Sequence, residues 1–117
     1  PPPDIDLDAW QRSVHVLRAC APRRLLLTHF GAFGDPSWHL DDLLCRLHHW
    51  AGWIEGRLQT APDAGDALVA DLEARAAAEV RRAGGDAHLS AGYELATPAH
   101  MTVTGIARWL ATRDALL

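Results

Sequence analysis

One histidine stands in a sequence pattern that could present it for metal chemistry. Residues 25–28 (LLLT) form a short apolar run without helical gaps, which predicts a strand that is buried on both faces. His29 follows that strand, and Gly31 and Gly34 let the backbone turn just where the imidazole is presented. Neutral imidazole is a ligand of zinc and iron, and a strand end holds it in a fixed orientation. His29 is therefore the candidate metal ligand.

A second arrangement would use histidines from helices. The further candidates are His39, His48 and His100. Together with His29 they could converge in a helical bundle, which would make the chain a freestanding metal-binding or protein-interaction module. His48 and His49 point about 100° apart on a helix, so only one of them could share a site with His39. This arrangement also requires LLLTHF to be helical, and the glycines that follow argue against that.

Four helices and one short strand make up the predicted fold, which is mainly α. The helices are expected over residues 7–20, 36–59, 66–83 and 98–113, and the strand over residues 25–28. Apolar residues recur at three- and four-residue spacing in each helical stretch, and Asp35-Pro36 supplies a capping side chain and a first-turn proline. The second and third helices are expected to form an antiparallel hairpin. Residues 86–96 have no clear period and are predicted to be a loop with one helical turn at most.

Small residues inside the predicted helices are expected to serve packing. Gly52 and Gly56 lie four residues apart, which predicts close packing of a backbone or an aromatic ring against that strip. Cys20 and Cys45 lack a C-x-x-C spacing and are predicted to be buried, reduced and structural.

Composition favours one folded domain over residues 1–117 in the cytoplasm. Apolar residues make up 49% of the chain and charged residues 22%, which is typical of a globular protein. The net charge is −4 and the basic residues are dispersed, so no nucleic-acid partner is expected. No apolar stretch approaches the roughly 20 residues of a membrane span, and the start PPPDID does not resemble a signal peptide. Pro1-Pro2-Pro3 is expected to continue a linker from an upstream part.

The strand, the Thr-His-Phe-Gly sequence, the glycine turn and the long amphipathic helix together resemble the final segment of metallo-β-lactamase-fold hydrolases. DLDAWQRSVHVLRACAP (residues 6–22) is similar to the helix that commonly precedes that strand. YELATPAHMTVTGIARWL (residues 93–110) resembles the closing helix of a branch with an extended helical tail. The resemblance covers nearly the whole chain.

This resemblance implies that the chain is the C-terminal part of an αββα metal-dependent hydrolase, in which His29 completes a two-metal site of zinc or iron. The family's His-x-His-x-Asp-His cluster does not occur in the 117 residues. The chain alone is therefore expected to be inactive and to bind no metal, with the other ligands in an upstream hydrolase domain of the same protein. Its helices would form a wall of the substrate cleft or a dimerisation surface. Self-association is also expected, because a strand without its sheet leaves apolar surface and backbone groups uncovered.

Overall fold

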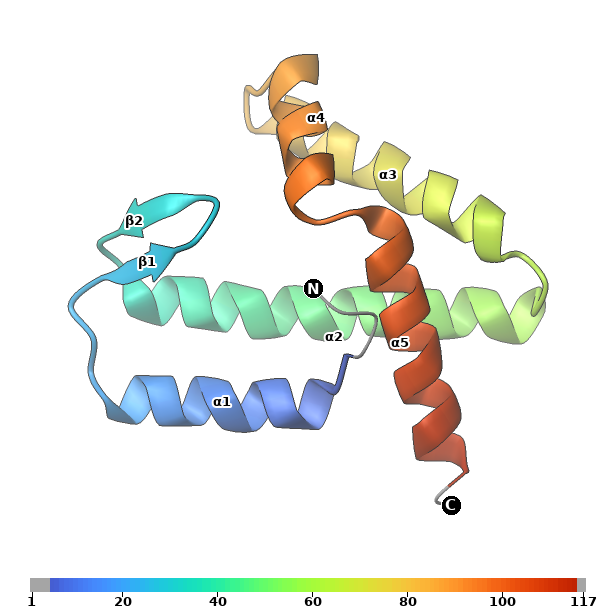
Figure 1. Cartoon of the computed structure of the whole chain (residues 1–117), viewed down its shortest axis with the longest axis horizontal. Helices are drawn as coiled ribbons and strands as arrows, with labels where there is room; N and C mark the ends of the chain where they lie inside the picture. The colour runs from blue at the N-terminus through green and yellow to red at the C-terminus, as the bar shows by residue number, and fades with distance from the viewer. Residues whose placement is uncertain (1–4, 116–117) are drawn as a thin grey trace. The chain divides into compact units, whose positions relative to one another are not determined.

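The computed structural model describes residues 5–115 as five helices and one β-hairpin. In chain order the elements are α1 (Leu7–Ala19), β1 (Leu25–Leu27), β2 (Gly31–Phe33), α2 (Pro36–Thr60), α3 (Gly65–Arg82), α4 (Ala87–Ala96) and α5 (Ala99–Asp114) (Figure 1). The mainly helical prediction is confirmed, and each of the four expected helices begins and ends within one residue of its predicted bounds. The linker expected at Pro1-Pro2-Pro3 lies outside the described residues.

The predicted loop over residues 86–96 is wrong, because α4 occupies it. The cause is local. The Asp86 side chain accepts a hydrogen bond from the Leu89 backbone N–H at 2.9 Å, so it caps the new helix. Asp6 caps α1 through Ala9 N–H in the same way. A capping residue can therefore start a helix even where the apolar period is weak.

Contacts gather the described residues into two compact units. The first spans Asp6–Gly52, and the second contains Ile5 and residues 53–115. The 25 residues of α2 run through both. At 1.5 Å per residue α2 is roughly 37 Å long, which is more than one small core can cover.

The Asp6–Gly52 unit contains α1, the hairpin and the first part of α2. Its buried apolar residues are Leu7, Val14, Leu40 and Ala51. An ion pair between Arg18 and Asp41 joins the end of α1 to α2. Cys20 and Cys45 are both free and exposed, so the prediction that they are buried is wrong. They lie off the few positions at which these helices bury side chains.

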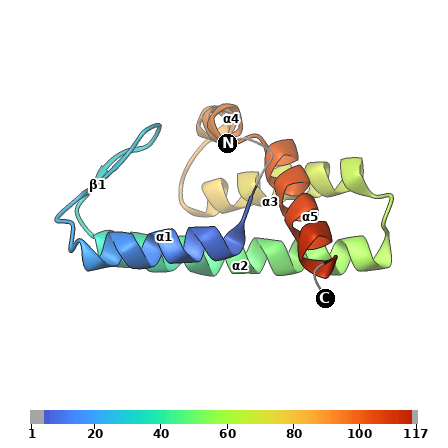
Figure 2. The same ribbon diagram turned by 60° about the horizontal axis from the view of Figure 1, so that its bottom comes forward.

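The second unit has its core along α3 and α5. Its buried apolar residues are Ile54, Leu68, Leu72, Ala99, Val103, Ile106 and Leu110. Both α4 and α5 lie against α3 (Figure 2). The predicted close packing of α3 against the second helix is wrong, because α3 packs against α4 and α5 instead. An ion pair still links α2 to α3, in which Arg57 donates to Asp71 at 2.8 Å.

The glycines of α2 do not mark a close approach. A Cβ added at Gly52 or Gly56 would meet nothing within 4 Å, so the predicted packing against this strip is wrong. The close approach occurs instead at Gly105 on α5, where an added Cβ would lie 2.7 Å from Ile5 Cγ1. Of the helices described over residues 5–115, none has the length and apolarity needed to cross a membrane.

Candidate functional site

The candidate ligand His29 lies in the turn of the β-hairpin. β1 and β2 pair antiparallel, with Leu25 opposite Phe33, Leu26 opposite Ala32 and Leu27 opposite Gly31. The turn closes where Phe30 N–H donates to Leu27 C=O at 3.0 Å. Gly31 follows with φ of +97°, a conformation that L side chains rarely adopt. A turn followed by a left-handed glycine is a common way to close a three-residue hairpin loop.

His29 itself is exposed at this turn. Its ring lies edge-on to Phe30, with 6.3 Å between the ring centroids. The predicted strand is present as Leu25–Leu27, but His29 lies in the turn beyond it and not at the strand end itself. The helix expected to follow begins at Pro36, where Asp35 accepts from Trp38 N–H at 3.2 Å. The histidine is therefore presented on a short hairpin that is attached directly to α2.

The predicted burial of the strand is wrong. Thr28 belongs to the turn, and Leu26 in the middle of β1 is 80% exposed. Side chains alternate across a strand, so Leu26 and Ala32 share one face of the hairpin and Phe33 lies on the other. The Phe33 ring contacts His39 on α2, with 4.3 Å between the ring centroids. The hairpin thus contacts α2 through the face of Phe33, on which Leu25 and Leu27 also lie. It leaves the opposite face uncovered, and we call this face, which carries Leu26, the leucine face.

Further apolar side chains lie exposed in the same unit. Trp38, in the first turn of α2, is 57% exposed, and both Leu27 and Phe30 are more than a third exposed. Within the described chain the sheet has two strands, so each strand keeps one edge without a strand partner. The unit that carries His29 therefore combines an exposed imidazole, exposed apolar side chains and open strand edges. We call Leu26, Leu27, Phe30 and Trp38 the hairpin apolar surface.

The other candidate histidines have separate local surroundings. His39 packs between aromatic rings, with its centroid 4.3 Å from Phe33 and 4.9 Å from Trp38. A ring nitrogen of His48, Nδ1, lies 2.8 Å from Leu44 C=O. His100 is exposed on α5. No three His, Cys, Asp or Glu side chains within residues 5–115 are grouped so as to hold a metal ion.

The four-histidine metal site in a helical bundle is therefore not formed among the described residues. It required LLLTHF to be helical, and residues 25–27 are a strand followed by a turn. His29 alone offers one ligand, whereas a zinc site needs three or four. The residues described do not by themselves fit a metal centre.

Two features of the structure were absent from the sequence interpretation. One is β2, because Gly31-Ala32-Phe33 was interpreted only as part of a glycine turn. A glycine three residues beyond a strand end, followed by two apolar residues, is the available signal for a three-residue hairpin loop. The other is a groove between α3 and α4, which depends on the unexpected helix α4.

The chain matches no protein-family model, no curated protein and no solved structure.

Proposed function

We propose that this chain is the C-terminal region of a metallo-β-lactamase-like, metal-dependent hydrolase, and that His29 supplies one metal ligand to a centre whose other ligands lie in another segment. The observation that carries the proposal is the exposed His29 on the turn of a hairpin whose leucine face is uncovered. The resemblance of the Thr-His-Phe-Gly stretch to the last ligand-bearing segment of that family supplies the reaction class.

Two physical properties of the hairpin support this assignment. An isolated two-stranded hairpin is marginal in water, and stable sheets have three or more strands or a packed helix. Leu26 at 80% exposure leaves apolar area in water that a covering layer would remove. Additional strands from a hydrolase domain would satisfy both the open edges and the leucine face. The histidine would then be fixed at the end of a longer sheet.

The chemistry assigned to the chain's own residues is limited. His29 would act as a neutral ligand, held by the turn that Phe30 N–H closes onto Leu27 C=O. A metal pair of this class supplies Lewis acidity for hydrolysis of a carbonyl or phosphoryl group. Neither Asp41 nor Asp42 is proposed as a ligand, because each is engaged by an arginine, Arg18 and Arg46 respectively. The 117-residue chain alone is proposed to be inactive.

The gene upstream of Pro1 provides the most direct test. We expect the same reading frame to encode a His-x-His-x-Asp-His cluster, and we expect the whole product to contain about two metal ions per chain by mass spectrometry. His29→Ala should lower this metal content and abolish hydrolysis of a panel of ester, lactam and phosphodiester substrates. His15→Ala, on the exposed side of α1, is the matched control and should change neither.

Two results would refute the proposal. One is an upstream reading frame that lacks the metal-binding cluster. The other is a whole product whose metal content is the same with His29→Ala as with His15→Ala. Calorimetry on the 117-residue chain adds an independent check: stoichiometric zinc binding tighter than micromolar, lost on mutating His39 and His48, would favour the bundle module instead.

Self-association of the isolated chain is a consequence of the same exposed surface. We expect two copies to cover the hairpin apolar surface by pairing strand edges. Leu26→Asp should weaken association, whereas Arg81→Asp, at an exposed position on α3, should not. Light scattering across a concentration series measures this. A strictly monomeric, folded chain at high concentration would contradict the prediction, and would mean that this surface is tolerated in water.

A further inference from the structure

A groove lies between α3 and α4, and its lining includes neither the hairpin nor His29. Its volume is about 260 Å³. Ala76, Ala77 and Val80 line it from α3, and Ala91 lines it from α4. These short side chains keep two adjacent helices from filling the space between them. None of the residues of α4 is buried, so the helix pair leaves apolar surface open along this seam.

The walls of the groove are held in place by the connection between the helices. Gly85 N–H donates to Val80 C=O at 2.8 Å and Gly84 N–H donates to Arg81 C=O at 3.0 Å, which closes the end of α3. Gly84 has φ of +86°, and a Cβ at Gly85 would lie 2.5 Å from Val80 Cγ1. The connection therefore fixes the start of α4 close to α3. At the other end of α4, Glu94 Oε1 accepts from Ala99 N–H at 2.9 Å. Both ends of α4 are thereby tied to the neighbouring helices.

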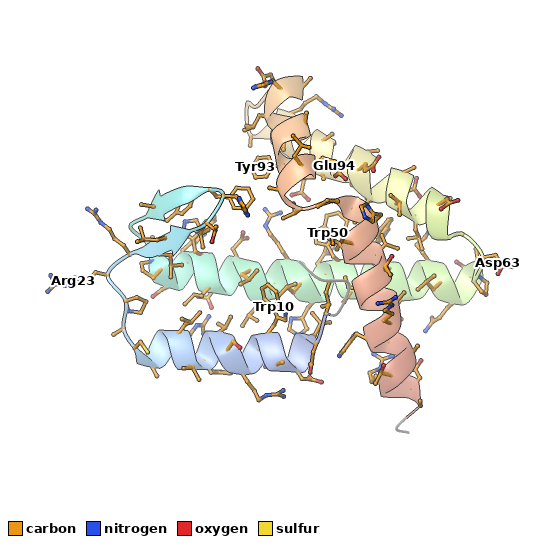
Figure 3. All side chains as sticks on the ribbon, viewed as in Figure 1. Trp10, Arg23, Trp50, Asp63, Tyr93 and Glu94 are labelled. Atoms are coloured by element: carbon orange, nitrogen blue, oxygen red, sulfur yellow. The ribbon has the colours of Figure 1, made fainter. Side chains whose placement is uncertain are left out.

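The polar groups at the groove have one sign of charge. Glu73 contributes a carboxylate from α3 and Glu94 another from α4, and no basic side chain lines the groove among the described residues. Glu94 uses one oxygen for Ala99 N–H, and a carboxylate retains further acceptor capacity. Tyr93, next to Glu94, adds an aromatic ring to the lining (Figure 3). Carboxylates and aromatic rings both favour an organic cation.

The volume limits the size of the occupant. A cavity of about 150 Å³ with apolar walls accepts benzene. A groove of about 260 Å³ has room for such a ring and a short chain that ends in an ammonium group. We propose that the α3–α4 groove binds a small primary ammonium compound with an apolar body, of the aryl- or alkylammonium class. Its apolar body lies on the alanines and its ammonium group lies between Glu73 and Glu94.

The test uses the 117-residue chain and 2-phenylethylammonium as the probe. In a ¹H–¹⁵N NMR titration we expect saturable shifts at Ala77, Val80, Ala91 and Glu94, with a dissociation constant on the order of millimolar for a ligand of this size. Phenylacetate has a similar apolar body and the opposite charge, so it should give no saturable shifts. Shifts confined to other residues, or equal binding of phenylacetate, overturn the proposal.

Variants with matched controls test the two halves of the groove separately. Glu73→Gln and Glu94→Gln should each weaken binding about two- to fivefold, as for loss of an exposed ion pair. Asp63→Asn removes the same charge at the α2–α3 connection, distant along α3 from the groove, and should have no effect (Figure 3). If Asp63→Asn weakened binding of the probe as much, the binding would reflect only nonspecific attraction of a cation to an acidic chain. That result would overturn the proposed site.

Filling the groove should abolish binding. Ala91→Leu places a larger side chain in it, whereas Ala70→Leu makes the same change at an exposed position on α3 outside the lining. Saturable binding that persists in a folded Ala91→Leu variant contradicts the proposal. If Ala91→Leu does not fold, the Glu73→Gln and phenylacetate measurements still test the proposed site. Glu73 is exposed, so its substitution leaves the helix pair intact. Success or failure here is independent of the hydrolase assignment, which concerns His29.

Discussion

The two compact units differ in how completely they cover their own apolar side chains. In the unit with residues 53–115, Ile54 and Leu68 are fully buried and Ile106 is nearly so. In the Asp6–Gly52 unit, Val14 is the only side chain buried to that degree among the described residues. Trp38 and Leu26 of that unit are more than half exposed. The unit with residues 53–115 also exposes large apolar side chains, but among the described residues these lie on α4: Leu89, Tyr93 and Leu95. The comparison therefore separates a region with a larger core from one that leaves more of its apolar side chains in water.

The largest expected difference in the free energy of unfolding is between variants of Leu68 in the core and Leu26 in the hairpin. Leu68→Ala should lower the free energy of unfolding by about 2–5 kcal/mol, because it leaves a cavity in the α3–α5 core. Leu26→Ala should change it by at most about 0.5 kcal/mol, because that side chain is already in water. Urea denaturation at low protein concentration, followed by circular dichroism, measures both. Equal costs would mean that the hairpin leucine is covered and would remove the contrast.

The second contrast is between glycines that look alike in sequence. Gly105→Ala should destabilise the protein by about 1–3 kcal/mol, since its Cβ would lie 2.7 Å from Ile5 Cγ1. Gly56→Ala should stabilise it by up to about 1 kcal/mol, because the new methyl group meets nothing within 4 Å and alanine favours the helix.

Ile5→Ala provides the control for this clash. If the Ile5 side chain causes the cost of Gly105→Ala, the double variant should lose less stability than the sum of the two single changes. Additive effects in thermal unfolding would place the cost of Gly105→Ala elsewhere in α5.

These glycines illustrate what the sequence could and could not predict. Helix bounds followed from apolar spacing and caps, which are local, and Asp35-Pro36 correctly marked the start of α2. The role of a glycine depends on which segment lies opposite it. Gly52 and Gly56 have the spacing of a packing site and no neighbour, whereas Gly105 is opposite Ile5, a hundred residues away along the chain.

The hairpin was also predictable only in its local features. The apolar run of Leu25 to Leu27 correctly indicated a strand, because β propensity is read over a few residues. Its burial was not predictable, since burial depends on which layers cover the strand. For α4 the apolar period was weak, and the Asp86 cap was the signal that would have identified it. His29 was predicted at the end of the strand, with the turn after it, whereas it lies within the turn, two residues beyond Leu27.

A third contrast lies within the hairpin connection. Gly31→Ala should destabilise the hairpin by about 1–2 kcal/mol, because Gly31 has φ of +97° and a Cβ is strained there. Gly34→Ala is the matched control three residues later, where no positive φ is present and no atom lies within 4 Å of an added Cβ. Amide hydrogen exchange of Leu27 and Phe33 measures the opening of the hairpin. If Gly34→Ala increased exchange as much as Gly31→Ala, the left-handed turn would not be what holds His29 in place.

The smallest expected effect concerns the ion pair between α2 and α5 in the second unit. Arg113 donates to Glu55 at 2.7 Å, and its guanidinium lies 5.3 Å from the Trp109 ring centroid. The hydrogen bond to Glu55, then that to Asp114, raises the pKa of Arg113 above its usual value. A raised pKa stabilises the fold below the unfolded-state pKa, and that stabilisation is lost only as pH rises through the folded-state value. Arginine stays protonated far above neutral pH in both states, so titration of Arg113 should not change the free energy of unfolding between about pH 6 and 9.

The salt dependence of stability should reveal the electrostatic contribution of the Arg113–Glu55 ion pair, which the pH dependence does not. Glu55→Gln removes the ion pair and leaves Arg113 beside Trp109, so its cost should shrink between 0.05 and 0.5 M NaCl, as for a screened interaction. Arg113→Met also removes the guanidinium from the ring, so it should cost more than Glu55→Gln and keep a part that salt does not reduce. A double-mutant cycle from denaturation curves separates the two contributions. A cost of Arg113→Met that vanished completely in high salt would mean that the contact with Trp109 contributes nothing, and that α5 is held to α2 at this point by charge alone.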